Sequence, residues 1–149
     1  MLIMTAKFPA KKVLLLVFLF IFGILAALLL PRSASSAISG SDDAERCAYL
    51  SSLGWEVEEK PIETLSISLP EPLAEPYLSY NEMQKLQGFD LSPLAGKTLT
   101  RCTYRVNNHP TLEPCQANLY IYEGEIVAGD IMCTGKNGFI SDLKFPQQQ

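Results

Sequence analysis

The sequence lacks most of the short motifs that identify an enzyme or a metalloprotein. It has a single histidine, His109, and no G-x-S-x-G elbow, phosphate-binding loop, C-x-x-C pair or EF-hand calcium loop. A nucleophilic enzyme needs a base that a third group holds in place, and this histidine lies in a proline-containing turn. The missing C-x-x-C argues against a thioredoxin-like site and a structural zinc site, whose ligands usually come in closely spaced pairs. The sequence therefore predicts no catalytic residue, no metal ligand and no cofactor.

Clustered positive charge is also absent. Lys7, Lys11 and Lys12 precede a long apolar block, and all 16 acidic residues of the chain follow it. An acidic domain repels the phosphate backbone, and no cluster of Lys or Arg interleaved with aromatic residues offsets that repulsion. We therefore expect no nucleic-acid partner.

The one long hydrophobic run is VLLLVFLFIFGILAALLL at residues 13–30. A helix of this length measures roughly 27 Å at about 1.5 Å per residue, just enough to cross a hydrocarbon core of about 30 Å. The basic residues within 1–12 predict a cytoplasmic N-terminus and a C-terminal domain outside, in a single-pass membrane protein. The alternative is a signal peptide that is cleaved near Ala37, where Ser35-Ser36-Ala37 supplies small residues, so that the domain is secreted. Both interpretations place the domain outside the cytoplasm.

The rest of the chain divides into a spacer, one domain and a short tail. Residues 31–41 (PRSASSAISGS) have the small, polar composition of a flexible spacer. Residues 42–146 have the length of one small domain, and residues 147–149 form a terminus that we expect to be frayed. We therefore expect one folded domain in this chain.

We expect an α+β domain with two helices and one antiparallel sheet. The first helix begins at Asp42, because Asp42-Asp43-Ala44-Glu45 has the form of a helix N-terminal cap, and it ends at Gly54. The second helix spans residues 77–87 and ends at Gly88. Alternating apolar and polar residues predict half-buried strands, of which the third to fifth form a meander and the last is a short edge strand. The expected strands are residues 55–58, 65–69, 98–106, 115–122, 125–132 and 139–143.

Four cysteines in an exported domain suggest disulfides, and four allow three pairings. A hairpin centred between Asn108 and His109 sets Cys102 opposite Cys115, and we expect these two to be bridged. Four free thiols are the alternative for a cell that lives without oxidants.

The next hairpin, at residues 123–124, decides the environment of Asp130. A two-residue turn pairs Cys115 with Met132 and turns Asp130 toward the face that carries Cys115. A three-residue turn pairs Cys115 with Cys133 and turns Asp130 away. We favour the two-residue turn.

Five polar residues are candidate binding residues. Asn81, Gln84 and Gln87 place amides at spacings of three along one face of the second helix, and Asp90 follows that helix. Such a row suits a peptide or a glycan, although a solvated helix face explains it equally well. Asp130 is expected to be a partly buried carboxylate with a raised pKa, unless a donor satisfies it. That environment suits an acid catalyst or a structural hydrogen-bond anchor, and we favour the anchor.

Four segments of the chain carry a resemblance to a known family. They are GWEV at 54–57, YNEMQKLQGFDL at 80–91, GK at 96–97 with TYRVNN at 103–108, and ANLYIYEGEIVAGDI at 117–131. Together they resemble the bacterial family called domain of unknown function 4830, over residues 44–146. The resemblance implies an N-terminal membrane segment and no assigned activity, so it transfers no catalytic residue. The chain departs from the expected pattern before Asp130, where Ala128-Gly129 replaces a second glycine.

These observations favour a non-catalytic, membrane-tethered module that binds a peptide, a glycan or a protein partner at the cell surface. Two alternatives remain open. One is a small extracytoplasmic hydrolase or transferase that uses Asp130 together with Asp90 or His109. The other is a structural subunit of a cell-envelope assembly.

Overall fold

The computed structural model describes residues 37–110 and 114–146. The predicted cytoplasmic segment at 1–12, the apolar block at 13–30 and the tail at 147–149 lie outside these residues. Within the described part of the chain, no helix is long and apolar enough to cross a membrane.

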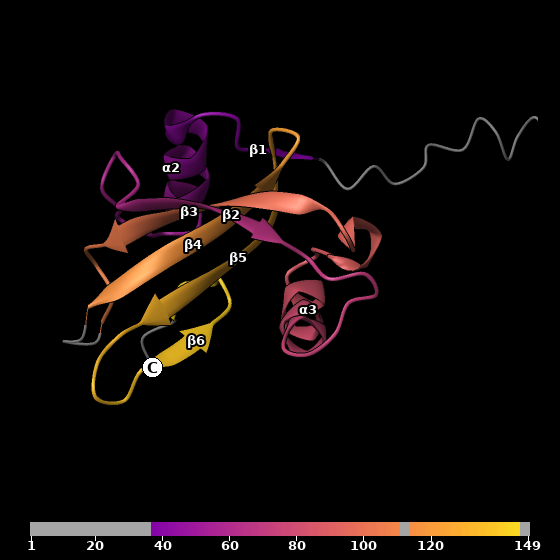
Figure 1. Ribbon diagram of the computed structural model, residues 1–149. Helices are drawn as coiled ribbons and strands as arrows, with labels where there is room; N and C mark the ends of the chain where they lie inside the picture. Colours follow the sequence, from indigo (N-terminus) through magenta and orange to yellow (C-terminus); the bar gives the residue numbers. More distant parts are fainter. Residues whose placement is uncertain (1–36, 111–113, 147–149) are drawn as a thin grey trace, which may run out of the picture. The chain divides into compact units, whose positions relative to one another are not determined.

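One antiparallel sheet of six strands runs through the domain (Figure 1). Its four longer strands follow one another as a meander: β2 (Glu63–Ser68), β3 (Thr98–Val106), β4 (Cys115–Tyr122) and β5 (Glu125–Cys133). Two short strands, β1 (Ile38–Ser39) and β6 (Phe139–Ser141), pair with the other side of β5. The predicted α+β class, the meander and the edge strand near Phe139 are confirmed. The expected strand at residues 55–58 contributes only an isolated bridge between Val57 and Val106.

Strand β1 corrects the start of the domain. The composition of residues 31–41 predicts a spacer, yet Ile38 pairs with Ile126, and the Gly40 N–H donates to the Gly124 carbonyl at 2.9 Å. Ile38 also packs against the core. The folded domain thus begins before Asp42, because one apolar residue in a polar segment suffices to complete a sheet edge.

Helix α2 (Asp43–Ser52) has the ends that the sequence predicts. The Asp42 carboxylate accepts a hydrogen bond from the Glu45 N–H at 2.9 Å and so caps the first turn. Gly54 follows the last turn with a φ of 98°, a conformation that a side chain disfavours. Leu50 is the fully buried residue through which the helix joins the core.

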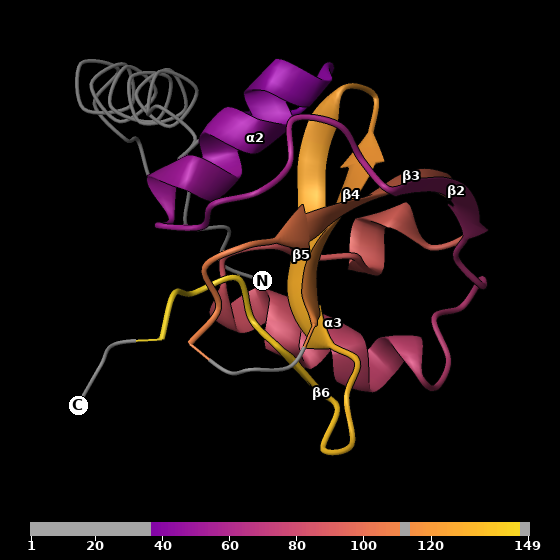
Figure 2. The same ribbon diagram turned by 90° about the vertical axis from the view of Figure 1, so that its left-hand side faces the viewer.

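Helix α3 (Tyr77–Leu86) and helix α2 lie on opposite faces of the sheet (Figures 1 and 2). The core on the α2 face contains Leu50, Trp55 and Leu119. A second core, with Leu91 and Leu99, lies on the α3 face, where the short 3-10 helix η1 (Ser92–Leu94) follows α3. Because α3 covers the second face, Asn118 and Asp130, which point away from α2, are buried under this helix instead of reaching solvent.

A β-bulge sets the register between β4 and β5. The hairpin has the predicted two-residue turn, in which Tyr122 pairs with Glu125. The register then shifts past Val127, so that Cys115 lies opposite Cys133. The same shift turns Asp130 away from the face that carries Cys115. The predicted turn is confirmed, but the predicted orientation of Asp130 is wrong because a bulge adds one residue to β5.

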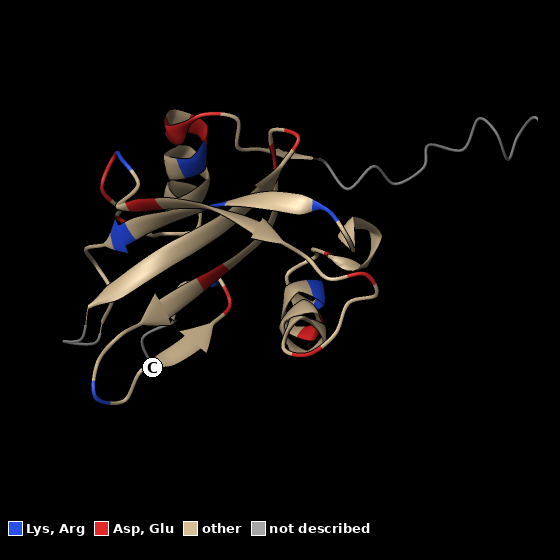
Figure 3. Ribbon diagram, viewed as in Figure 1, with Lys and Arg blue, Asp and Glu red and all other residues tan. Residues whose placement is uncertain are grey.

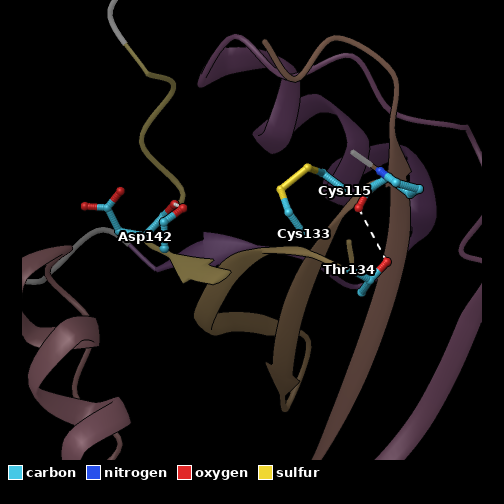
Figure 4. Close-up of a disulfide and its surroundings, with 6 residues drawn as sticks. Cys115, Cys133, Thr134 and Asp142 are labelled. Carbon is cyan, nitrogen blue, oxygen red and sulfur yellow. Dashed lines mark hydrogen bonds between the residues drawn. A yellow bond between two sulfur atoms is a disulfide. The ribbon is translucent and has the colours of Figure 1, made fainter. Parts of the chain in front are cut away.

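The disulfide joins Cys115 to Cys133 (Figure 4). The expected partner, Cys102, lies opposite Leu119 and is a buried free thiol. A bridge is confirmed, whereas the predicted pairing of Cys102 with Cys115 is wrong. The reason lies in the loop between β3 and β4. Val106, rather than Cys102, pairs with Cys115, so this loop is longer than a turn centred between Asn108 and His109 would be.

Candidate functional site

A pocket of about 280 Å³ lies between α3 and the sheet face that this helix covers. Most of its wall is apolar, and polar groups meet the cavity at a few places only. The apolar wall includes Leu69, Tyr77, Leu91, Leu99, Met132 and Ile140. A concave, mostly apolar cavity with few polar groups is the usual form of a binding site for a small group.

A row of polar side chains crosses three strands of the sheet, and two of its members, Asn118 and Asp130, line the pocket. Thr103, Asn118 and Asp130 lie directly opposite one another on β3, β4 and β5. The Thr103 hydroxyl donates to Asn118 Oδ1 at 2.8 Å, and Asn118 Nδ2 donates to Asp130 Oδ1 at 2.7 Å. From α3, the Tyr80 hydroxyl donates to Asp130 Oδ2 at 2.7 Å. Both carboxylate oxygens of Asp130 therefore accept a hydrogen bond from another side chain, as is usual for buried polar groups.

The pKa values of this row follow from its burial. Asp130 is 2% exposed, and burial raises the pKa of its carboxyl group, against the opposing effect of the donors Asn118 and Tyr80. Burial, followed by the charge of Asp130, also raises the pKa of Tyr80, so this phenol keeps its proton and donates it. A buried carboxylate that accepts hydrogen bonds from a neighbouring strand and from α3 has the properties of an anchor that fixes this helix to the sheet.

Arg101 is the cation of the pocket. Its Nη2 donates to Glu63 Oε2 at 2.6 Å. Its Nε, by contrast, is buried and has no hydrogen-bond partner among the described residues. A buried donor without a partner costs about 1–3 kcal/mol, so a bound group that brought an acceptor to this guanidinium would recover part of that cost.

Gln84 and Gln87 bind the backbone of one strand residue. Gln84 Nε2 donates to the Gly129 carbonyl and Gln84 Oε1 accepts from the Gly129 N–H, both at 2.9 Å. Gln87 Nε2 adds a bond of 3.1 Å to the same carbonyl. Along this edge of β5, β1 pairs only as far as Ile126, and β6 pairs only from Ile131 onward. Gly129 lies in the gap between them, where the two glutamines supply the hydrogen bonds that a neighbouring strand would make.

Asn81 and Asp90 hold the turn after α3. Asn81 Oδ1 accepts from the Leu91 N–H at 2.7 Å, and Asn81 Nδ2 donates to Asp90 Oδ1 at 3.0 Å. Asp90 Oδ1 also accepts from the Ser92 N–H at 2.9 Å. The Asn81 amide and the Ser92 backbone lower the pKa of Asp90 to about 2.

Of the five predicted binding residues, Asp130 lines the pocket. The four others, Asn81, Gln84, Gln87 and Asp90, make the internal bonds described above, and Asn81 and Gln84 are buried. The amides therefore point into the domain, Gln84 and Gln87 toward β5 and Asn81 toward the turn after α3, and a solvated helix face is the wrong interpretation. Whether any of the five binds a ligand stays a prediction.

The structure does not bring the alternative catalytic partners to Asp130. Asp90 and His109 do not line the pocket. His109 stacks on Trp55, with ring centroids 5.6 Å apart, and Trp55 belongs to the core on the other face of the sheet.

Sequence reasoning missed Tyr80, Arg101 and Asn118 as residues of the pocket, and it missed Thr103 as the partner of Asn118. The signal for one of them was present, since Asn118 interrupts the strand segment CQANLYIY. An amide in the interior of an otherwise apolar strand indicates buried hydrogen bonding. The partners of that amide lie on other strands and could not be identified from spacing.

Charged residues of the described domain are dispersed. Figure 3 shows Lys and Arg spread over helices, strands and loops, with acidic residues between them and most of the sheet uncharged. The expected absence of a nucleic-acid partner stays a prediction.

A comparison with protein families gives a match over a range that contains most of the site. The family model described as Domain of unknown function (DUF4830) matches residues 49–131, more than half of the chain. The matched range contains β2, α3, β3, β4 and most of β5, and with them the polar row of the pocket. No curated protein and no solved structure matches the chain.

Proposed function

We propose that this protein, which belongs to the family described as domain of unknown function 4830, is a non-catalytic binding module that holds an apolar side chain of a protein or peptide partner in the pocket under α3. The resemblance in the sequence is confirmed by the family match, and the family description names no activity. The proposal therefore rests on the pocket.

The chemistry of the pocket favours an apolar group over a glycan. Its wall is mostly apolar, and the carboxylate at its floor already holds two donors, from Asn118 and Tyr80. A sugar would need several free hydrogen-bonding groups. A volume of about 280 Å³ lies just below the range of about 300–1,000 Å³ that is typical of ligand pockets. One side chain, with an acceptor near Arg101, suits this size.

Location outside the cytoplasm is part of the proposal. The apolar block at 13–30 serves as the tether, with the N-terminus inside and the domain outside. The disulfide between Cys115 and Cys133 supports an oxidising compartment. Secretion after cleavage near Ala37 is the alternative, and it would leave β1 intact because this strand begins at Ile38.

The two other functions have less support. A hydrolase or transferase would need a nucleophile or second catalytic group beside Asp130, and neither Asp90 nor His109 lines its pocket. A structural subunit of an envelope assembly could use the same pocket for a fixed partner. A crosslinking pulldown of the intact protein separates a structural subunit from a transient binder. If the protein is a subunit, the pulldown should recover one fixed membrane partner.

The proposal is tested by fragment binding to the full-length protein in detergent. Small aromatic and aliphatic fragments should shift NMR signals of pocket residues such as Met132. Ile140→Trp, which places a large ring at the pocket wall, should weaken these shifts at least tenfold. Leu86→Trp is the control, since Leu86 is 88% exposed on α3 and does not line the pocket. The proposal is wrong if no fragment perturbs the pocket, or if both variants bind fragments like the parent.

A further inference from the structure

A second cluster of chemically reactive side chains lies away from the pocket. His109, Cys115 and Cys133 each offer one metal-ligating atom, and these atoms all lie within 4.8 Å of one another. The two cysteines belong to the core on the α2 face, whereas the pocket lies on the α3 face. Figure 4 shows their sulfur atoms joined across the ends of β4 and β5.

The imidazole of His109 is held in place by two aromatic rings. It stacks on Trp55 at an interplanar angle of 8° and a centroid distance of 5.6 Å. Phe139 contacts it at 5.9 Å and 54°. Trp55 is itself fixed, because it is 1% exposed and its indole N–H donates to the Leu143 carbonyl at 2.7 Å. The ring of His109 is thus oriented by packing before any ligand is present.

We propose that reduction of the Cys115–Cys133 disulfide converts this cluster into a zinc site formed by two thiolates and the His109 imidazole. A dithiol reductant transfers two electrons to the disulfide and is itself oxidised to a disulfide, which leaves two thiols on the protein. Zinc binding displaces the two thiol protons to solvent, and the two thiolates neutralise the charge of the ion. A three-ligand set leaves the fourth tetrahedral position to water.

The geometry suits zinc after small side-chain rotations. Zinc bonds of about 2.3 Å to sulfur and about 2.0 Å to nitrogen place tetrahedral ligand atoms roughly 3.5–3.8 Å apart, within the 4.8 Å limit of this cluster. Cys115 and Cys133 lie directly opposite on neighbouring strands, so the sulfurs can separate by rotation while the backbone stays paired. The sequence argument against zinc used the missing C-x-x-C. Here strand pairing brings together cysteines that are 18 residues apart.

The test uses the full-length protein in detergent, in a Cys47→Ser, Cys102→Ala background that removes the other two thiols. After reduction by a phosphine and its removal under nitrogen, the protein is titrated with Co²⁺, which reports thiolate ligation by charge-transfer absorption, and then with Zn²⁺ in competition. Trp55, the single tryptophan of the chain, should report Co²⁺ binding by quenching of its fluorescence. We expect one Co²⁺ per chain in the reduced protein and none in the oxidised protein.

His109→Phe is the matched variant, because it keeps an aromatic ring beside Trp55 and removes the ligand nitrogen. We expect its affinity for Zn²⁺ to fall at least tenfold. Equal affinity of this variant and the parent would overturn the proposal, as would reduced protein that gives no thiolate absorption with Co²⁺.

Folding of the reduced protein is checked by circular dichroism. If reduction unfolds the domain, addition of Zn²⁺ should restore the folded spectrum, since an ion that binds only the folded state stabilises it. Failure of Zn²⁺ to restore it would also refute the site. Neither readout depends on the pocket under α3, so this inference and the proposed function fail independently.

Discussion

Replacement of Gln84 by methionine should destabilise the domain strongly, although it preserves the length and volume of the side chain. Gln84 is fully buried, and its amide makes two bonds of 2.9 Å to the backbone N–H and carbonyl of Gly129. Methionine can make neither bond. Because α3 covers this edge of β5, water cannot replace the lost amide without opening the packing.

The magnitude follows from what the variant leaves unpaired. The Gly129 N–H loses its partner outright, which costs about 1–3 kcal/mol for a buried group. The Gly129 carbonyl keeps the bond from Gln87 at 3.1 Å, so its loss is nearer to the net value of one hydrogen bond, about 0.5–1.5 kcal/mol. The sum is about 1.5–4.5 kcal/mol. For a domain of roughly 100 residues this corresponds to a fall in Tm of roughly 10–20 °C.

The assay is urea unfolding followed by the fluorescence of Trp55, which lies in the core. Lys85→Met is the control, since Lys85 neighbours Gln84 on the helix but its side chain is 44% exposed. Its ion pair with Glu82 lies at the surface, so its loss should leave the urea midpoint nearly unchanged. If Gln84→Met were as stable as Lys85→Met, the strand-like role of the Gln84 amide would be refuted.

Three further predictions concern the same sheet. Reduction of the Cys115–Cys133 bridge in metal-free buffer should lower the free energy of unfolding by about 3 kcal/mol, the loop entropy for a separation of 18 residues; an unchanged urea midpoint would contradict this. Since burial raises the folded-state pKa of Asp130, the folded protein keeps that proton to higher pH than the unfolded chain, and stability should fall as pH rises from about 4 through the folded pKa. Asp130→Asn should flatten that part of the profile, and parallel profiles would show that another group titrates. Gly129→Ala places a Cβ 3.1 Å from the Asn118 carbonyl oxygen and 2.5 Å from Leu143 Cδ1. This crowding should lower the free energy of unfolding in urea by about 1–3 kcal/mol. A variant as stable as the parent would show that the backbone at Gly129 shifts to accommodate the methyl group.

The elements of this domain could be predicted where local chemistry decides them. The Asp42 cap and Gly54 define α2, and the alternation along β3, β4 and β5 defines the meander. The tight turn at Glu123 and Gly124 was also readable, because glycine readily adopts the positive φ that such a turn requires. Each of these features depends on residues that are close in the chain.

The candidate site was less predictable, because its residues meet through register. Asp130 could be singled out as a buried carboxylate, but its donors Asn118 and Tyr80 come from a neighbouring strand and from a helix 50 residues away. The amides of α3 could be seen as a row, whereas their acceptor at Gly129 depends on where β1 and β6 stop along β5.

The sequence by itself determined the α+β class, the two helices, the meander, the presence of cysteines able to bridge and the resemblance that the family match confirms. Only the tertiary structure decided which cysteine pairs with Cys115 and which face receives Asp130. A single bulge at Val127 sets Cys133 opposite Cys115 and turns Asp130 to the α3 face, because one added residue exchanges the two faces of a strand. The loop of the first hairpin separately places Cys102 opposite Leu119. Covering both faces then buries Asp130 under α3, where a one-sided sheet would have exposed it.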